Sequence, residues 1–456
     1  MNMKKAGDKT AIFETMSVPK ALAIMSLPAV VAQLVATTYG IADAWFIGCV
    51  DNPYMIAASS LVQTFYLILM ALATLFGSGG GNLLARQLGK GDSEGARKTA
   101  SYSIVMAAIV VLCFSLICLV FMEPILRILG ASDNTLGFAK QYVLAATVVG
   151  GVPIVLSSTM PMILRSAGYS KEAGIGVAMA SIINIALDPL LMFVILPDGY
   201  QVLAAGIATA LANVIALAYF ILMYRKVGRS SVLEVPKRLE HLDATSLKSL
   251  YSVGLPAAIA LLLFSVVTIV LNLLAASYGD ITLAALGIVL KVERLPQNVG
   301  MAICLCMVPL VAYNFGRGDL KRMDSFFSAT RRVLLALGLL SMGICIVFAQ
   351  PIVSAFLDDP EVVHVGTALI RVRAISFPLM LLGLQTIYFT QAVDRGKLAF
   401  VLSVTRYVLL CIPSMLILNA LFGIDGLTWS QSVSDTVFLI VAIFTYLRVR
   451  KQIGTA

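Results

Sequence analysis

The feature that most constrains the fold of this chain is a series of twelve long apolar segments. A transmembrane helix needs ~20 mostly apolar residues, at ~1.5 Å rise per residue, to cross ~30 Å of hydrocarbon. Each segment is therefore predicted to be a membrane-spanning helix. The segments lie near residues 21–47, 54–80, 99–122, 138–164, 172–196, 202–224, 250–277, 282–312, 327–350, 364–390, 398–421 and 426–447.

The composition excludes a soluble enzyme with a large core. Of the 456 residues, 59% are hydrophobic and 12% are charged. A soluble domain has roughly half its residues apolar and about a quarter charged. We therefore expect an all-α integral membrane protein in contact with the lipid bilayer. The polar first twenty residues predict no signal peptide, and no glycine-rich segment ends in the GK[ST] of a phosphate-binding loop, so ATP is not expected as the energy source.

The basic residues predict the orientation of the chain in the membrane. When the N-terminus is placed inside, most of the 33 Lys and Arg fall in cytoplasmic segments. The outer segments then hold only Arg127, Lys140, Arg371 and Arg373. This asymmetry is what orientation by positive charge predicts. Both termini are therefore expected in the cytoplasm, and the net charge of +9 requires no nucleic-acid partner.

The two halves of the sequence resemble each other, with six apolar segments in each. Three short motifs recur in the same order, namely SLPA at 26–29 as GLPA at 254–257, LGKGD at 88–92 as FGRGD at 315–319, and AAGIATA at 204–210 as IDGLTWS at 424–430. We predict an N-terminal lobe over residues 1–225, a cytoplasmic linker over 226–249 and a C-terminal lobe over 250–456. Transporters built from two parallel halves of this kind place their substrate path between them.

Two carboxylates lie well inside predicted helices of the first half. Asp43 precedes Asp51 of the outer turn by eight residues, and Asp188 precedes Asp198 by ten. At helical rise the two carboxylates lie about 12 and about 15 Å below the outer turns. Ionisable side chains are costly in hydrocarbon and normally mark function. This matching depth predicts a site in which the two acids act together.

Each of these acids has a polar residue one helical turn before it on the same face, Tyr39 before Asp43 and Asn184 before Asp188. Two nearby carboxylates in a low dielectric cannot both ionise cheaply. We therefore interpret the cluster as a buried site for a proton or for Na⁺, which prefers oxygen ligands. The alternative is a pair of acids near the outer mouth, each solvated separately.

The second half contains a different set of charges. Its predicted spans hold five of them, Lys291, Glu293, Arg294, Arg406 and Asp435. Mutual neutralisation within the helix bundle is favoured over a role in substrate binding. Pro28 and Pro256 lie inside spans and favour kinks. The glycine run GSGGG at 77–81 is interpreted as a site of close helix packing.

The order of these motifs resembles the MATE (multidrug and toxic compound extrusion) family, and most closely its bacterial multidrug-export members near the branch named after the DNA-damage-inducible protein F. The resemblance covers nearly the whole chain and rests on LPA in the first span, YGIADAWFIG at 39–48, the GKGD loop, NIALDP at 184–189 and GIATA at 206–210. It implies a V-shaped fold of two pseudo-symmetric six-helix lobes that enclose a central cavity.

The same resemblance implies a function. It implies export of cationic or amphipathic small organic molecules, such as drugs or toxins, across a bacterial cytoplasmic (inner) membrane in exchange for H⁺ or Na⁺. No other cofactor is expected, and we expect a monomer. Carried over, the coupling site falls on Tyr39, Asp43, Asn184, Asp188 and Thr209, and Na⁺ would be held by Asp43, Asn184, Asp188 and Thr209. The substrate is expected in the central cavity, where no residues are assigned.

Two alternatives stay open at this point. A flippase for lipid-linked sugars shares the architecture, and it would need a cationic cavity for a diphosphate. The main candidates for such a cavity, Lys291, Arg294 and Arg406, are few. An intramembrane aspartyl protease would use Asp43 and Asp188 as a catalytic dyad. Neither acid lies in the YD or GxGD context of such enzymes, so exchange of a cation is the preferred interpretation.

Overall fold

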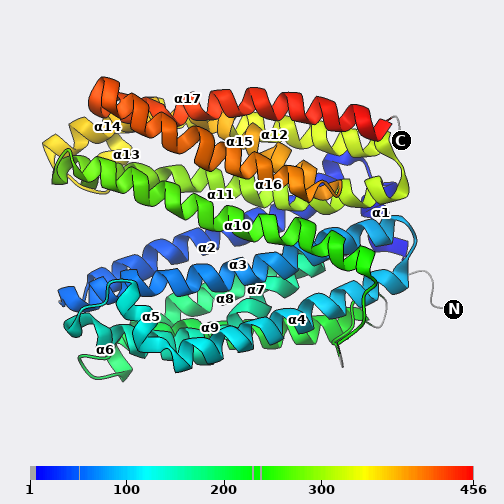
Figure 1. Cartoon of the computed structure of the whole chain (residues 1–456), viewed down its shortest axis with the longest axis horizontal. Coiled ribbons are helices and arrows are strands. Elements are labelled where there is room, and N and C mark those ends of the chain that lie inside the picture. Colours follow the sequence, from blue (N-terminus) through cyan, green and yellow to red (C-terminus); the bar gives the residue numbers. More distant parts are fainter. Residues whose placement is uncertain (1–6, 51, 229–230, 237–238, 455–456) are drawn as a thin grey trace. The chain divides into compact units, whose positions relative to one another are not determined.

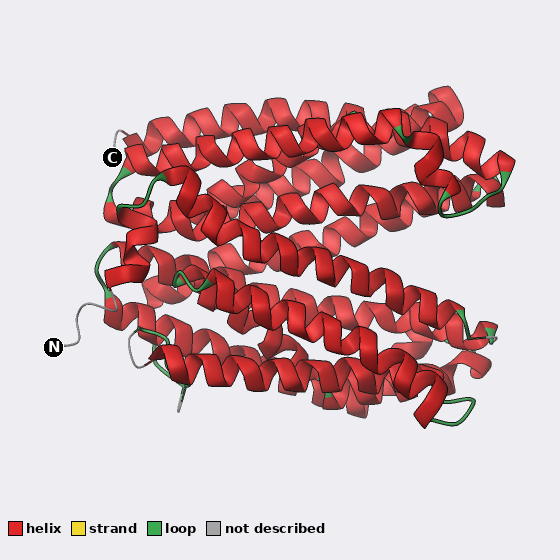
Figure 2. Cartoon of the chain, turned by 180° about the vertical axis from the view of Figure 1, so that it is seen from behind, coloured by secondary structure: helices red, strands yellow, loops and turns green. Residues whose placement is uncertain are grey.

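The predicted apolar segments are helices in the computed structural model, which describes residues 7–50, 52–228, 231–236 and 239–454. Asp51, which set the predicted depth of Asp43, lies outside these ranges. The residues described form helices, turns and loops without any strand, and the helices are joined by short loops (Figure 2). The chain divides into two units, the first made of Met1–Ser17 and Ala23–Ala258, the second of Val18–Leu22 and Ile259–Ala456.

The α-helices that precede the second half of the sequence are labelled in Figure 1, and two π-helices lie between them in the chain. They are α1 (Gly7–Glu14), α2 (Val18–Gly48), α3 (Pro53–Gly89), α4 (Ser93–Val120), α5 (Met122–Ile128), α6 (Asp133–Tyr142), the π-helix η1 (Val143–Val149), α7 (Gly151–Ser166), α8 (Ser170–Leu190), the π-helix η2 (Leu191–Ile195) and α9 (Gln201–Gly228). Within the first unit, α3 packs against both α4 and α7, and α8 packs against α9.

The remaining helices begin with α10 (Ala244–Ala276), whose residues up to Ala258 belong to the first unit. They continue with α11 (Asp280–Arg317), α12 (Leu320–Val347), α13 (Ala349–Ser354), α14 (Pro360–Ala374), α15 (Ser376–Ala392), α16 (Gly396–Val404), the π-helix η3 (Thr405–Cys411) and α17 (Ile412–Gly454). In the second unit, α15 contacts α11, α12 and α17.

The number of described helices that are long and apolar enough to cross a membrane is nine, or eleven if each of two bent pairs is one span. The last of these, Gly396–Gly454, is 59 residues long. It contains Gly423 at φ 60° and ψ −139°, where two helices meet at a kink. Division at this glycine makes the count consistent with the predicted twelve.

Two predicted spans are bent helix pairs, which the apolar pattern did not predict. Asp133–Val149 meets Gly151–Ser166 at 51°, and Pro360–Ala374 meets Ser376–Ala392 at 43°. The first bend follows the π-helix η1. A π-helical turn breaks the regular hydrogen-bond ladder and is a common cause of sharp kinks. Hydropathy reports only that a segment is apolar, so it cannot locate such a break.

The recurring GKGD and GRGD motifs have the same local structure. Gly91 and Gly318 have φ of +79° and +81°, a left-handed conformation that glycine adopts without steric cost. Asp92 then caps α4 by accepting a hydrogen bond from the Gly95 N–H at 2.8 Å. Asp319 caps α12 by accepting from the Arg322 N–H at 2.9 Å. Each motif therefore ends one helix and starts the next.

The glycine run of α3 allows close helix packing, as predicted. A Cβ added at Gly79 would meet the Leu250 carbonyl oxygen and the backbone of Gly254 on α10. One at Gly80 would overlap the Ser103 hydroxyl of α4, and one at Gly81 would overlap Ser166 of α7. Three neighbouring helices therefore approach α3 so closely that a methyl group has no room.

Candidate functional site

The candidate site begins on α8, where Asp188 lies in the last turn of the helix, two residues before its end. Its side chain is fully buried, and so is that of Asn184 one turn before it. Thr209 of α9 is also buried and faces Asn184. The first turns of α9 are rich in alanine and glycine. Small residues let two helices approach closely, which brings the polar side chains of α8 and α9 into contact.

Asn184 connects the other two residues. With the amide oriented to satisfy its neighbours, its nitrogen lies 3.0 and 2.9 Å from the two carboxylate oxygens of Asp188 and donates to them. Its oxygen then accepts a hydrogen bond from the Thr209 hydroxyl at 3.3 Å. In the opposite orientation the nitrogen donates to the Thr209 oxygen, also at 3.3 Å. Amide nitrogen and oxygen occupy equivalent positions, so the surrounding network decides between them.

The two amide orientations suit two chemical states of Asp188. An ionised carboxylate only accepts hydrogen bonds and therefore suits the orientation that presents the amide nitrogen. The opposite orientation places the amide oxygen against the carboxylate oxygens, which is favourable only with a proton or a cation between them. The geometry of Asn184 and Asp188 can therefore accommodate both an empty, charged carboxylate and a neutralised one.

Asp43 of α2 supplies the second acid and is half-buried. It interacts electrostatically with Asp188. It also lies within electrostatic range of the hydroxyl groups of Tyr39, Tyr66 and Tyr142. The three tyrosines are half-buried. Hydroxyl groups of this kind can donate to a charged carboxylate.

The structure therefore brings the five predicted site residues into one cluster, Asn184, Asp188 and Thr209 by direct contact and Tyr39 and Asp43 by charge interaction. Sequence reasoning missed Tyr66 of α3 and Tyr142 of α6. The Tyr142 hydroxyl lies near Thr209. Neither tyrosine shares a helix with the acids, so helical spacing gives no signal for them.

The donor set suits a proton or a hard monovalent cation. Within residues 7–50, 52–228, 231–236 and 239–454, no three His, Cys, Asp or Glu side chains come together as a metal site. The cluster instead offers two carboxylates, an amide and hydroxyl groups. Oxygen ligands of this kind suit hard cations, whereas softer transition metals favour nitrogen and sulfur. The chemistry of the cluster thus fits H⁺ or Na⁺.

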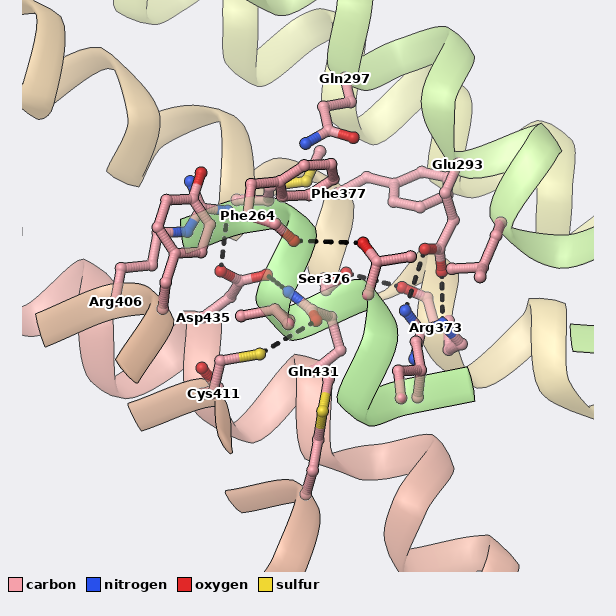
Figure 3. A pocket seen from close by; sticks show the side chains of 18 of the residues that line it. Phe264, Glu293, Gln297, Arg373, Ser376, Phe377, Arg406, Cys411, Gln431 and Asp435 are labelled. Atoms are coloured by element: carbon pink, nitrogen blue, oxygen red, sulfur yellow. Dashed lines mark hydrogen bonds and ion pairs between the residues drawn. The ribbon is translucent and has the colours of Figure 1, made fainter. Parts of the chain in front are cut away.

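The charged residues of the second unit form buried ion pairs, shown in Figure 3. Arg406 donates to Asp435 at 3.1 Å, which confirms the predicted neutralisation for these two residues. Glu293 instead pairs with Arg373, whose Nη2 lies 3.0 Å from Oε2. Arg373, which the sequence assigned to an outer segment, lies near the C-terminal end of α14, and its buried side chain is neutralised by an acid on another helix.

Lys291 and Arg294 differ from these paired residues. Both are exposed, and neither has an ion-pair partner in the part of the chain that the structure describes. The expectation of mutual neutralisation therefore fails for these two cations. Spacing along one helix could not reveal this, because the neighbouring acid Glu293 is paired with Arg373 of another helix.

Comparison with known proteins identifies the family. The MatE family profile matches residues 28–190 and 256–417, more than half of the chain and one segment in each half. The multidrug export protein MepA of Staphylococcus haemolyticus (strain JCSC1435) is 30% identical over 446 residues, covering 97% of this chain and 96% of that protein. MepA of Staphylococcus aureus (strain MRSA252) is 30% identical over 447 residues with the same coverage.

Solved structures agree on the fold. An outward-facing multidrug resistance MATE family transporter of the MOP superfamily superposes with a TM-score of 0.92 at 20% identity, over 100% of both chains. A crystal structure of MATE in complex with MaL6 gives the same score, covering 98% of this chain and 99% of that chain. With the family profile matched in both halves, the chain belongs to the MATE family of membrane transporters.

Proposed function

We propose that this protein is a secondary active multidrug exporter, which exchanges cationic or amphipathic small organic molecules for H⁺ or Na⁺. The family and the names of the relatives support export of drugs. The observation that carries the coupling proposal is the buried contact of Asp188 with Asn184, beside Asp43. A carboxylate held dry in this way strongly favours a state in which a cation neutralises it.

The proposed mechanism is alternating access. A cation from outside enters the cluster around Asp188 and Asp43, and the neutralised site favours a different conformation of the first unit. Drug is released outside as the equilibrium shifts, because a ligand moves an equilibrium only through its differential affinity for the two states. For an uncharged drug, moving one coupling cation through ~100 mV supplies about 2.3 kcal/mol, which sustains a concentration ratio of tens. For a monovalent cationic drug the one-for-one exchange is electroneutral, and the concentration gradient of the coupling ion supplies the free energy.

The proposal extends to placement in the cell. Homologues come from bacteria, so we infer a bacterial cytoplasmic membrane with both termini inside, and a monomer as the working unit. The flippase alternative loses support because the relatives are named multidrug export proteins. Of its three candidate cations, Arg406 is neutralised by Asp435, and only Lys291 and Arg294 remain unpaired among the described residues. The protease alternative is not retained, because the chain belongs to a family of transporters.

The test is the replacement of Asp188 by Asn in cells that export ethidium. Export is expected to fall to the level of cells without the protein, because an amide cannot exchange a proton or neutralise a cation. Asp198→Asn is the matched control, since this exposed acid lies ten residues further along, in the turn after η2. Ethidium export that is unchanged in Asp188→Asn, at equal amounts of protein in the membrane, would remove Asp188 from the mechanism.

A further inference from the structure

The second unit contains a cavity that the coupling proposal does not use. It has a volume of about 70 Å³ and is lined by residues of α10, α11, α14, α15, η3 and α17. One water needs about 10–15 Å³, so the cavity has room for several waters or for a polar ligand group. Figure 3 shows Glu293 and Arg373 on one side and Arg406 and Asp435 on the other. We call it the C-unit cavity.

Arg373 has a donor that the protein leaves without a partner. Its Nε and Nη2 both donate to Glu293 and complete a bidentate pair. Its Nη1 is buried and has no hydrogen-bond partner in the described part of the chain. Leaving a buried charged donor unsatisfied is costly, and such groups are rare in native structures. Nη1 is therefore the nitrogen of this guanidinium that still lacks an acceptor within the described part of the chain.

The charges around the C-unit cavity do not cancel. Arg294, Arg373 and Arg406 line it together with only two acids, Glu293 and Asp435. Both acids are already paired, as described above. Arg294 is exposed and has no ion-pair partner among the residues described. One formal positive charge therefore remains, which a single negative charge would neutralise.

The other walls of the C-unit cavity are aromatic and apolar. Phe264, Phe377 and Tyr407 line it, with the rings of Phe264 and Tyr407 in edge-to-face contact at 6.0 Å. Two polar side chains of the lining are engaged inside the protein, since Ser376 donates to the Arg373 carbonyl and Gln431 to Asp435. Gln297 and Ser434 also line the cavity, and the Ser434 hydroxyl is buried without a partner among the described residues. The cavity therefore combines the positive charge of its arginines with rings that suit an aromatic body.

We propose that the C-unit cavity is a second ligand site, which takes the carboxylate of an aromatic organic acid or zwitterion. Arg373 Nη1 donates to the carboxylate from the buried end, and Arg294 neutralises it from the exposed end. Arginine suits this role because its planar N–H groups match carboxylate geometry. The site widens the substrate class of the proposed exporter beyond cations and does not depend on the coupling site.

The test is equilibrium binding of 2-naphthoate to the purified full-length protein in a neutral detergent, without any ion gradient. The neutral analogue 2-naphthamide is the matched probe. Wild-type protein is expected to bind the naphthoate saturably and at least about tenfold more tightly than the amide. Arg294→Gln is expected to raise the Kd for naphthoate about tenfold and to leave the Kd for the amide unchanged.

Two further variants make the result specific. Arg373→Gln combined with Glu293→Gln removes the buried pair without leaving one charge alone, and it is expected to abolish the preference for the acid. Arg371→Gln, an exposed arginine two positions away on α14 that does not line the cavity, is the control and should bind as the wild type does.

Equal binding of acid and amide by the wild type would overturn the proposal. So would a wild-type Kd in Arg294→Gln, which remains decisive if the double variant fails to fold, because Arg294 is exposed. Failure of ethidium export would overturn the proposed transport function alone, since naphthoate binding is measured without transport.

Discussion

The buried ion pair between Arg406 and Asp435 allows a quantitative prediction about stability. The side chain of Arg406 is 5% exposed and that of Asp435 is 0% exposed. Asp435 also accepts a hydrogen bond from Gln431 at 2.8 Å. Replacing Arg406 by Gln would leave the carboxylate of Asp435 in the protein interior with Gln431 as its remaining donor. The protein must then bear an uncompensated charge or neutralise the acid by protonation.

The expected loss in the free energy of unfolding is large because both partners of the pair are buried. Removing one partner of a buried ion pair costs about 3–5 kcal/mol. A second pair, Arg450 with Asp324, provides the contrast, since these side chains are 29% and 30% exposed. Exposed pairs contribute about 0–1 kcal/mol because water screens them. Arg450→Gln is therefore expected to lower the free energy of unfolding by several-fold less than Arg406→Gln.

The free energy of unfolding is measured by titrating the purified variants with a denaturing detergent in mixed micelles and following helix content. The double variant Arg406→Gln with Asp435→Asn should recover much of the loss, because no charge is left unpaired. Equal losses for Arg406→Gln and Arg450→Gln would refute the reasoning. So would a double variant that is less stable than Arg406→Gln alone.

Three further predictions concern single substitutions, two in the first unit and one in the second. Tyr142→Phe is expected to slow ethidium export without abolishing it, because it removes only a hydroxyl that lies near Thr209 and Asp43; the export rate in energised cells checks this. Gly254→Ala is expected to lower the free energy of unfolding by about 1–3 kcal/mol, since its methyl group would overlap a backbone carbonyl of α3. Gly287→Ala, where nothing lies within 4 Å, should leave that free energy unchanged or raise it by up to about 1 kcal/mol, as the same detergent titration would show.

The sequence predicted the helical architecture well, because a membrane leaves few choices for apolar segments of spanning length. Pro28 and Pro256 lie inside α2 and α10, as expected, and the glycines at 77–81 mark close helix contacts. The π-helices and the two bends were not predictable. They depend on local hydrogen bonding and on packing between helices, which hydropathy does not record.

The candidate site was predictable to the extent that its members share a helix face or a family motif. Asp188 and Asn184 are one turn apart, so spacing alone placed them together. Tyr66 and Tyr142 come from other helices, and only the folded chain brings them to Asp43. The partner of Arg373 also lies on another helix and was not predictable from the sequence. The charge of Arg373 suggested an outer loop until the structure revealed Glu293 as its partner.

The central claim is that cation binding at Asp188 drives export. The most direct measurement is ethidium movement in proteoliposomes that carry a pH gradient alone or a Na⁺ gradient alone. We predict that one of these gradients drives transport by the wild type and that Asp188→Asn abolishes this transport while the protein stays folded. Equal rates with and without a gradient, or wild-type rates in Asp188→Asn, would contradict the account.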